Sequence, residues 1–109
     1  MILKIDTTKT QGVTIELIDQ KTGKKDKLIK TQEIGSQVLL PMIIKILRKN
    51  KLTFTDLTAI EVNPGPGSFT GTRVGVSVAN VLGFALGIPV NGKRGKIAIP
   101  IYEKSKFDI

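Results

Sequence analysis

The chain has 109 residues, the size of a single domain, and 17 basic against 9 acidic side chains give it a formal net charge of +8. It contains neither cysteine nor histidine. This excludes disulfides, thiolate nucleophiles and cysteine or histidine metal ligands, and it removes the commonest general base. The longest uncharged run, Val74–Gly92, is interrupted by Ser77, Asn80 and Pro89, so we expect no membrane span and a soluble, cytoplasmic protein.

The first third of the chain predicts three strands. Ile2–Ile5 is a short buried strand, ended by the turn-forming residues Asp6-Thr7-Thr8. Val13, Ile15 and Leu17 alternate with Thr14, Glu16 and Ile18, a period of two that predicts a second strand. Gln20–Lys24 contains Thr-Gly and predicts a hairpin turn. Lys25–Thr31 then returns as a lysine-rich edge strand, because charge on an edge discourages pairing with another chain.

The middle of the chain predicts a helix followed by a strand. The helix runs over Gly35–Asn50, with Ser36 as its N-cap and Arg48 near its C-terminus. Pro41 is expected near the first turn, where its missing N–H costs little; deeper in the helix it would cause a kink. Ala59–Asn63 is the fourth strand.

A second helix is predicted from Phe69 or Thr70 to Leu86, with Gly87 placed to end it. A brief strand over Ile88–Val90 follows. Ile97–Tyr102 is predicted as an edge strand or an extended arm, because Pro100 lies inside it. The order β-β-β-α-β-α-β predicts an α/β fold with helices packed on a mixed sheet, which is the order of a single ribonuclease-H-like lobe.

The first helix has more apolar surface than one sheet can cover. Its apolar residues span an arc of roughly 240°, whereas a helix on a sheet needs a stripe of only about 100°. The excess predicts contact with another chain. From this helix the predicted partner-binding residues are Leu39, Met42, Ile43 and Ile46.

The second helix carries small residues at every fourth position, namely Gly71, Gly75, Ala79 and Gly83. Such a ridge allows close approach of another backbone. Either it packs on this chain's own sheet or first helix, or it meets a partner chain. For the partner hypothesis, the residues chosen from this helix are Gly71, Val74, Gly75, Val78, Ala79 and Leu82.

The glycine-rich turn between the fourth strand and the second helix points backbone N–H groups and a helix N-terminus at one place, which suits an anion. The candidate anion-binding residues are Gly65, Gly67, Ser68, Thr70 and Arg73. No Gly-Lys-Ser/Thr follows, so the turn is not a Walker A loop. A purely architectural turn is the alternative. No catalytic or metal-ligating residue is predicted, and no cofactor.

The block Gly65-Pro-Gly-Ser-Phe-Thr-Gly-Thr-Arg-Val-Gly75, continued to Leu86-Gly-Ile-Pro89, resembles the signature of the TsaB family. Ile2–Thr8 and Leu39–Ile43 resemble that family's opening strand and first helix. The resemblance implies an actin-like ATPase-superfamily lobe over residues 1–91. Residues 92–109 would then be a basic turn and a C-terminal arm. Family members normally have two lobes and about twice this length, and a His-Ser pair where this chain has Gly35-Ser36.

The resemblance also implies a function. Members of the family are non-catalytic subunits that pair through their two helices with the related enzyme TsaD, in threonylcarbamoyladenosine synthesis on the tRNA adenosine beside the anticodon. The ATPase TsaE then joins, and a homodimer forms when TsaD is absent. Contact with tRNA would be indirect.

Three alternative functions stay open. The chain could be the remnant of an ATP-dependent actin-like enzyme, with Asp6 holding Mg²⁺ through water and Lys9 or Thr7–Thr8 near phosphate. It could be a basic module that binds tRNA directly. A peptidase is disfavoured, because Ser68 has no histidine base.

Overall fold

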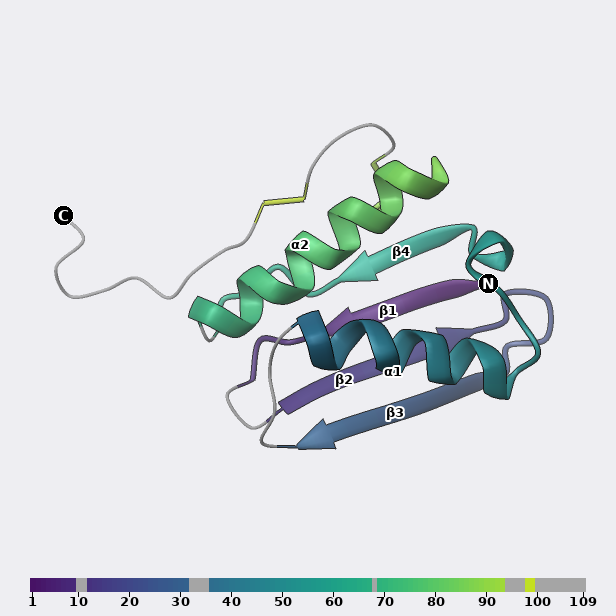
Figure 1. Ribbon diagram of the computed structural model, residues 1–109. Coiled ribbons are helices and arrows are strands. Elements are labelled where there is room, and N and C mark those ends of the chain that lie inside the picture. The colour runs from purple at the N-terminus through teal and green to yellow at the C-terminus, as the bar shows by residue number, and fades with distance from the viewer. Residues whose placement is uncertain (10–11, 32–35, 68, 94–97, 100–109) are drawn as a thin grey trace, which may run out of the picture.

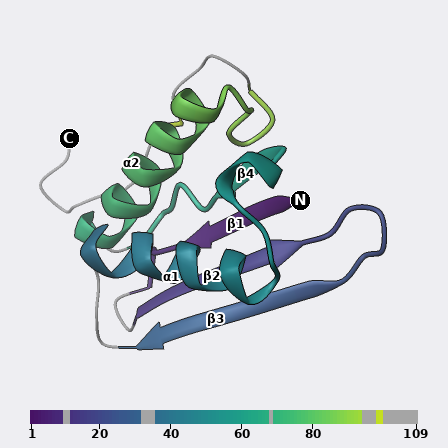
Figure 2. The same ribbon diagram turned by 45° about the vertical axis from the view of Figure 1, so that its right-hand side comes forward.

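The computed structural model describes residues 1–9, 12–31, 36–67, 69–93 and 98–99. Its elements are β1 (Ile2–Asp6), β2 (Gly12–Ile18), β3 (Lys25–Thr31), α1 (Ser36–Lys49), a 3-10 turn at Phe54–Asp56, β4 (Ala59–Val62) and α2 (Phe69–Leu86). The strands form one mixed sheet in the order β3-β2-β1-β4, with β1 antiparallel to β2 and parallel to β4. Both helices cover the same face of this sheet (Figures 1 and 2).

The core lies between this sheet face and the helices, because apolar residues occupy alternate strand positions. Paired residues of β1, β2 and β4 share the face, as Ile5 does with Ile15 and Val62. The strand side chains buried there are Leu3, Ile5, Val13, Ile15, Leu17, Ile60 and Val62. The predicted α/β class and mixed sheet are confirmed, and the predicted boundaries of the strands and helices through α2 agree with the observed ones within one residue.

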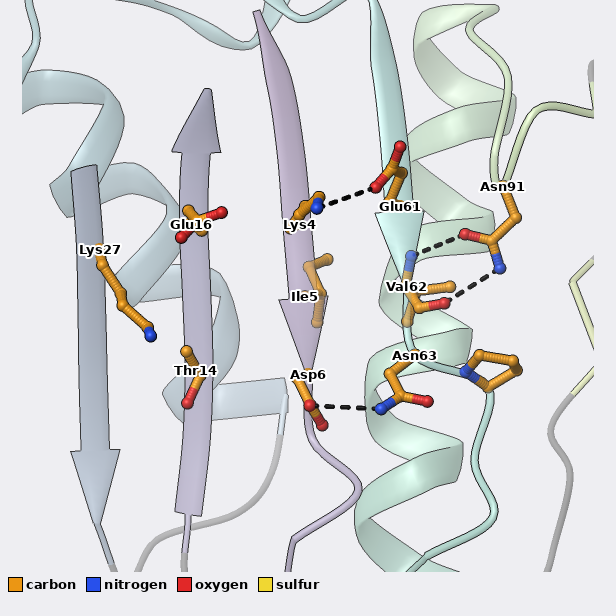
Figure 3. A pocket seen from close by; sticks show the side chains of 11 residues that line it. Lys4, Ile5, Asp6, Thr14, Glu16, Lys27, Glu61, Val62, Asn63 and Asn91 are labelled. Carbon is orange, nitrogen blue, oxygen red and sulfur yellow. Dashed lines mark hydrogen bonds and ion pairs between the residues drawn. The ribbon is translucent and has the colours of Figure 1, made fainter. Parts of the chain in front are cut away.

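The other face of the sheet is polar and carries a row of alternating charge. The register places Lys27, Glu16, Lys4 and Glu61 side by side on the four adjacent strands. Figure 3 shows this row, in which Lys4 Nζ lies 3.5 Å from a Glu61 carboxylate oxygen. Both side chains are about half exposed, so the pair itself adds little stability. Opposite charges on adjacent strands attract each other, and such a row of charged side chains is typical of a sheet face that is exposed to water.

The seventh predicted element is shorter than expected. Val90 forms a single parallel bridge with Ile60 of β4, and no longer strand is found among residues 88–93. Asn91 extends the contact with its side chain. The Asn91 amide accepts from the Val62 N–H at 2.8 Å and donates to the Val62 carbonyl at 3.0 Å. A side-chain amide thus replaces the backbone of a neighbouring strand.

Pro41 lies deeper in α1 than the first turn. It is the sixth residue of Ser36–Lys49, so its ring replaces the N–H that would bond the carbonyl of Gln37. Pro41 is exposed, and water can reach this part of the helix. The prediction of a first-turn proline was wrong, because the helix begins at Ser36 nearly as predicted and Pro41, five residues further on, already lies in the second turn.

The end of α2 is confirmed. Gly87 has a φ of 65°, a conformation that favours glycine. The N–H of Ile88 donates to the Gly83 carbonyl at 3.1 Å, and that of Gly87 to the Phe84 carbonyl at 3.4 Å. These are the two hydrogen bonds of a Schellman motif, which satisfies the last carbonyls of the helix.

Thr72 offers a site where the stability can be raised. It is fully buried in α2, and its hydroxyl has no hydrogen-bond partner in the part of the chain that the structure describes. Valine has the same shape without the polar group, so Thr72→Val is expected to stabilise the protein by about 1 kcal/mol, or about 5 °C in Tm. Calorimetry checks this. The exposed Thr70 is the control, since Thr70→Val should give no such gain.

Candidate partner-binding surface

The glycine ridge of α2 faces this chain's own sheet. A Cβ atom on Gly75 would lie 2.2 Å from the Thr7 hydroxyl oxygen, and one on Gly83 would lie 2.3 Å from Val90 Cγ2. Both distances are far below van der Waals contact. Glycine at these positions therefore lets α2 approach the end of β1 and the Val90 bridge. Of the two hypotheses for the ridge, close packing on the chain's own sheet explains Gly75 and Gly83.

The Thr7 side chain is hydrogen-bonded to the backbone of α2. Its hydroxyl donates to the Gly71 carbonyl and accepts from the Gly75 N–H at 3.1 Å. These two backbone groups are the pair that an α-helix normally joins directly. The Thr7 side chain is fully buried, so both bonds lie away from water. The β1–β2 loop is in this way fastened to the first half of α2.

Eight of the ten predicted partner-binding residues are buried inside this chain. They are Leu39, Met42, Ile43, Ile46, Gly71, Gly75, Val78 and Ala79. Leu39, Ile43 and Ile46 have no exposed surface at all, since they meet the sheet. A partner cannot contact such side chains while the fold is intact. Val74 and Leu82 keep part of their surface exposed.

The exposed apolar residues of the helices lie on their outer side. Leu40 and Ile44 of α1 are 38% and 37% exposed, and Val81 and Phe84 of α2 are 66% and 92% exposed. Together with the half-buried Val74 and Leu82 we call these the helix surface. Residues Val81 and Phe84 were not singled out from the sequence. On a helical projection Val81 and Phe84 fall on the same stripe as the polar residues Arg73 and Ser77. This shared stripe is the sequence signal that could have identified them as exposed.

Helical geometry shows that α1 and α2 turn apolar flanks toward each other. Val38 and Met42 line a hollow beside β3. Leu40 and Ile44 lie about 200° further round α1, on the flank away from β3 and toward α2. Leu40 and Ile44 of α1 therefore lie on the side of Leu82 of α2, whereas Phe84, about 40° from Asn80, lies at the outer border of the helix surface.

The matching flank of α2 is located by Asn80. The Asn80 amide accepts from the Ala98 N–H at 2.8 Å and donates to the Ala98 carbonyl at 3.0 Å. Ala98 and Ile99 lie across α2 from α1 (Figure 1). Val78 and Leu82 are about 200° from Asn80 and so face α1. Of the expected segment 97–102, only these two residues are described, and neither forms a strand.

The glycine-rich turn packs against the β1–β2 loop. Gly65 has a φ of 102°, which favours glycine, and a Cβ on Gly67 would lie 2.6 Å from the Thr8 carbonyl oxygen. These contacts support the architectural role. Of the other candidate anion-binding residues, Thr70 and Arg73 are exposed, and Ser68 lies outside the described residues. Anion binding at this turn stays a prediction.

Asp6 organises the carboxyl end of β1. Its carboxylate accepts from the Thr8 hydroxyl at 2.7 Å and the Thr8 N–H at 3.0 Å. It also accepts from the Asn63 amide at 3.3 Å, as Figure 3 shows. Burial raises the pKa of Asp6, but these hydrogen bonds outweigh burial and hold the pKa below its ordinary value. Within the described residues no group of three potential ligands gathers around a metal position. The geometry is that of a turn held by its aspartate.

The lowered pKa predicts how Asp6 affects acid stability. A depressed carboxyl pKa contributes stability above the unfolded-state pKa, and that stability is lost as the pH falls through the folded-state pKa. The difference in unfolding free energy between wild type and Asp6→Asn should therefore be present at pH 7 and shrink below about pH 4. Urea titrations across that range measure it. A difference independent of pH would contradict the assignment.

The same end of the sheet carries a shallow hollow of about 610 Å³ on the polar face, lined in part by Asp6, Thr14, Asn63 and Asn91 (Figure 3). Its walls include the alternating charge row. Around this hollow the cations Lys4 and Lys27 alternate with the anions Glu16 and Glu61, so the hollow itself offers little concentrated charge for a ligand of one sign.

A model of the family described as "TsaD: tRNA N6-adenosine threonylcarbamoyltransferase" matches residues 31–92, more than half of the chain. The chain belongs to this family. It is 34% identical over 91 residues to the tRNA threonylcarbamoyladenosine biosynthesis protein TsaB of Escherichia coli, covering 84% of this chain and 38% of that protein. An uncharacterized protein of Mycobacterium tuberculosis is 48% identical over 93 residues, covering 84% and 44%.

Solved structures agree with this assignment. YeaZ from Pseudomonas aeruginosa superposes with a TM-score of 0.74 at 30% identity, over 82% of this chain and 41% of that one. The resemblance to the TsaB family and the ribonuclease-H-like fold are thereby confirmed. The chain spans less than half the length of these relatives. In the described residues, no helix is long and apolar enough to cross a membrane.

Proposed function

We propose that the chain is a non-catalytic, cytoplasmic subunit that pairs with a TsaD-like protein in threonylcarbamoyladenosine synthesis on tRNA. Its family membership and its likeness to TsaB of Escherichia coli support the pathway. The observation that supports pairing is the helix surface, where Val81 and Phe84 are mostly exposed. The contact would use the outer side of α1 and α2 rather than the buried ridge.

The energetics favour a covered helix surface. Apolar area removed from water contributes about 25 cal/mol per Å², and aromatic residues dominate the energy of many interfaces. Phe84 contributes nothing to this chain's core, since it is 92% exposed. Leu40 and Ile44 extend the apolar area onto the neighbouring helix. A partner that presents two helices of its own would bury all of them.

A non-catalytic role is consistent with the residues that the structure describes. The carboxylate of Asp6, the candidate magnesium residue, already accepts hydrogen bonds from Thr8 and Asn63. Those bonds fix the β1–β2 loop on the neighbouring turn. The ATP-binding alternative would require Asp6 to give up or share these contacts, and calorimetry with ATP and Mg²⁺ tests it directly.

The experiment for pairing is co-expression of this chain with the host's TsaD-like protein, followed by size-exclusion chromatography. We expect a complex with one copy of each, and modification activity that depends on both chains. Separate elution at micromolar concentration would overturn the proposal. A homodimer without the partner would use the same surface, so addition of the TsaD-like protein should dissolve it. Addition of a TsaE-like ATPase then tests a third subunit.

A further inference from the structure

The outer edge of β3 is a second surface, distinct from the helix surface. β3 pairs with β2 along all seven of its residues, and no other described strand pairs with it. Figures 1 and 2 show β3 at the border of the sheet, with α1 lying above it. An edge strand carries backbone donors and acceptors that can bind an added strand.

The hydrogen-bond pattern shows which backbone groups point outward. The Asp19 N–H donates to the Lys24 carbonyl at 2.8 Å, so this position, next to the Ile18–Lys25 pair, is a hydrogen-bonding position of the antiparallel ladder. Such positions alternate along the ladder. Residues 26, 28 and 30 therefore bond to β2, whereas Lys25, Lys27, Ile29 and Thr31 direct their N–H and carbonyl groups away from the sheet.

The core-side flank of this edge is hollow. A cavity of about 250 Å³ lies between β3 and α1. Its apolar lining includes Leu28, Val38 and Met42, and Lys45 lines it as well. A strand added beside β3 would direct every second side chain toward α1. Apolar side chains at those positions would enter this cavity.

The charge of the edge selects the partner. Lys25 and Lys27 lie on the polar face of β3, and Lys45 is exposed on α1. The acidic residue of the strand, Asp26, is already engaged by Lys49 at 3.3 Å and by the Asn50 amide at 2.9 Å. Lysines on an edge disfavour pairing of two identical copies and attract acidic groups. Ile29, which is 62% exposed, adds apolar area on the polar face.

We propose that the β3 edge binds an extended acidic segment of a partner protein by strand addition. Backbone hydrogen bonds to Lys25, Lys27 and Ile29 would fix the segment. Its apolar side chains would fill the cavity under α1, and its acidic side chains would face Lys25 and Lys27. This surface is separate from Val81 and Phe84, so it can be occupied while the helix surface is paired.

The test is fluorescence anisotropy with a labelled nine-residue peptide in which Glu or Asp alternates with Val or Ile. We expect saturable binding that weakens between 50 and 200 mM salt. The same peptide with lysine in place of the acidic residues should not bind. An acidic peptide N-methylated at alternate residues, which removes donors without changing charge, should bind about tenfold more weakly or not at all. Equal binding of the N-methylated peptide would overturn strand addition.

Substitutions in the chain provide the reciprocal test. Ile29→Pro removes an outward N–H and leaves the bonds to β2 in place, because proline is tolerated on edge strands. It should weaken binding about tenfold, whereas Ile29→Thr, which keeps the N–H, should change it by less than about threefold. Circular dichroism confirms the fold of each variant. Self-association that Ile29→Pro abolishes would show that a second copy occupies the edge, and would overturn the acidic-partner proposal.

Discussion

Replacing Gly75 with valine is expected to destabilise the protein by roughly 3–5 kcal/mol, a large part of the stability of a single domain. The new side chain would begin 2.2 Å from the Thr7 hydroxyl oxygen. To avoid that overlap, either α2 or the β1–β2 loop must move. Both movements break the bonds that Thr7 makes with Gly71 and Gly75. Chemical denaturation of wild type and variant measures the loss.

Ser77→Val is the matched control. Ser77 lies in the same helix but is exposed. The methyl groups of valine would therefore point into solvent rather than into the buried core of the described residues. Serine and valine have similar helix propensities, and we expect a change below about 0.5 kcal/mol. An equal loss in both variants would mean that valine disturbs the helix itself, rather than its contact with Thr7.

A double-mutant cycle isolates the contact between Thr7 and Gly75. Gly75→Ala and Thr7→Ala should each destabilise the protein. The double variant should lose at least about 1 kcal/mol less than their sum, because removing the hydroxyl relieves the overlap. Additive losses would contradict a direct contact. Because a bulky residue at Gly75 would destabilise the monomer itself, such a variant cannot serve as a test of pairing.

Phe84→Asp combined with Val81→Asp is expected to weaken pairing with the TsaD-like protein at least about 100-fold, or about 2.7 kcal/mol. The double variant removes exposed apolar area and places two carboxylates in a surface that pairing would dehydrate. Both residues project away from the core, so the monomer should keep its stability. Isothermal titration calorimetry with the purified partner measures the affinity.

Ile29→Asp is the control for this prediction. Ile29 is also a largely exposed apolar residue, at 62%, but it lies on β3, away from the two helices. The same kind of substitution there should leave pairing within about twofold of wild type. If the Val81 and Phe84 variants pair normally, the helix surface is not the contact. If Ile29→Asp alone prevents pairing, the partner binds the sheet edge instead.

Local patterns predicted most of the fold. The alternation at Val13–Ile18, the Thr-Gly hairpin and the glycine after α2 each specify geometry within a few residues. The start of α1 was predicted to within one residue, but Pro41 is the sixth residue of the helix and so lies in the second turn rather than the first. The Val90 bridge is a single residue pair, too short for a periodic signal.

The candidate site could be predicted only in part. The width of the apolar arc correctly indicated that the helices expose apolar area, as at Leu40 and Ile44. The arc could not show which of its residues the sheet covers. Helical periodicity shows which residues share a face of the helix, but not which other element packs against that face. The small-residue ridge had the same ambiguity. The positions of Thr7 against Gly75 and of Val90 against Gly83 show that the ridge faces inward.

The insertion of Thr7 between Gly71 and Gly75 also bears on the order in which the chain folds. The β2–β3 hairpin needs only local contacts and can form early. The first half of α2 receives one of its bonds from a residue 68 positions earlier in the chain. We expect that bond to form after β1 has paired with β2 and β4, because it joins two segments far apart in the sequence. We therefore expect α2 to acquire its full protection from hydrogen exchange last, together with the closure of the sheet.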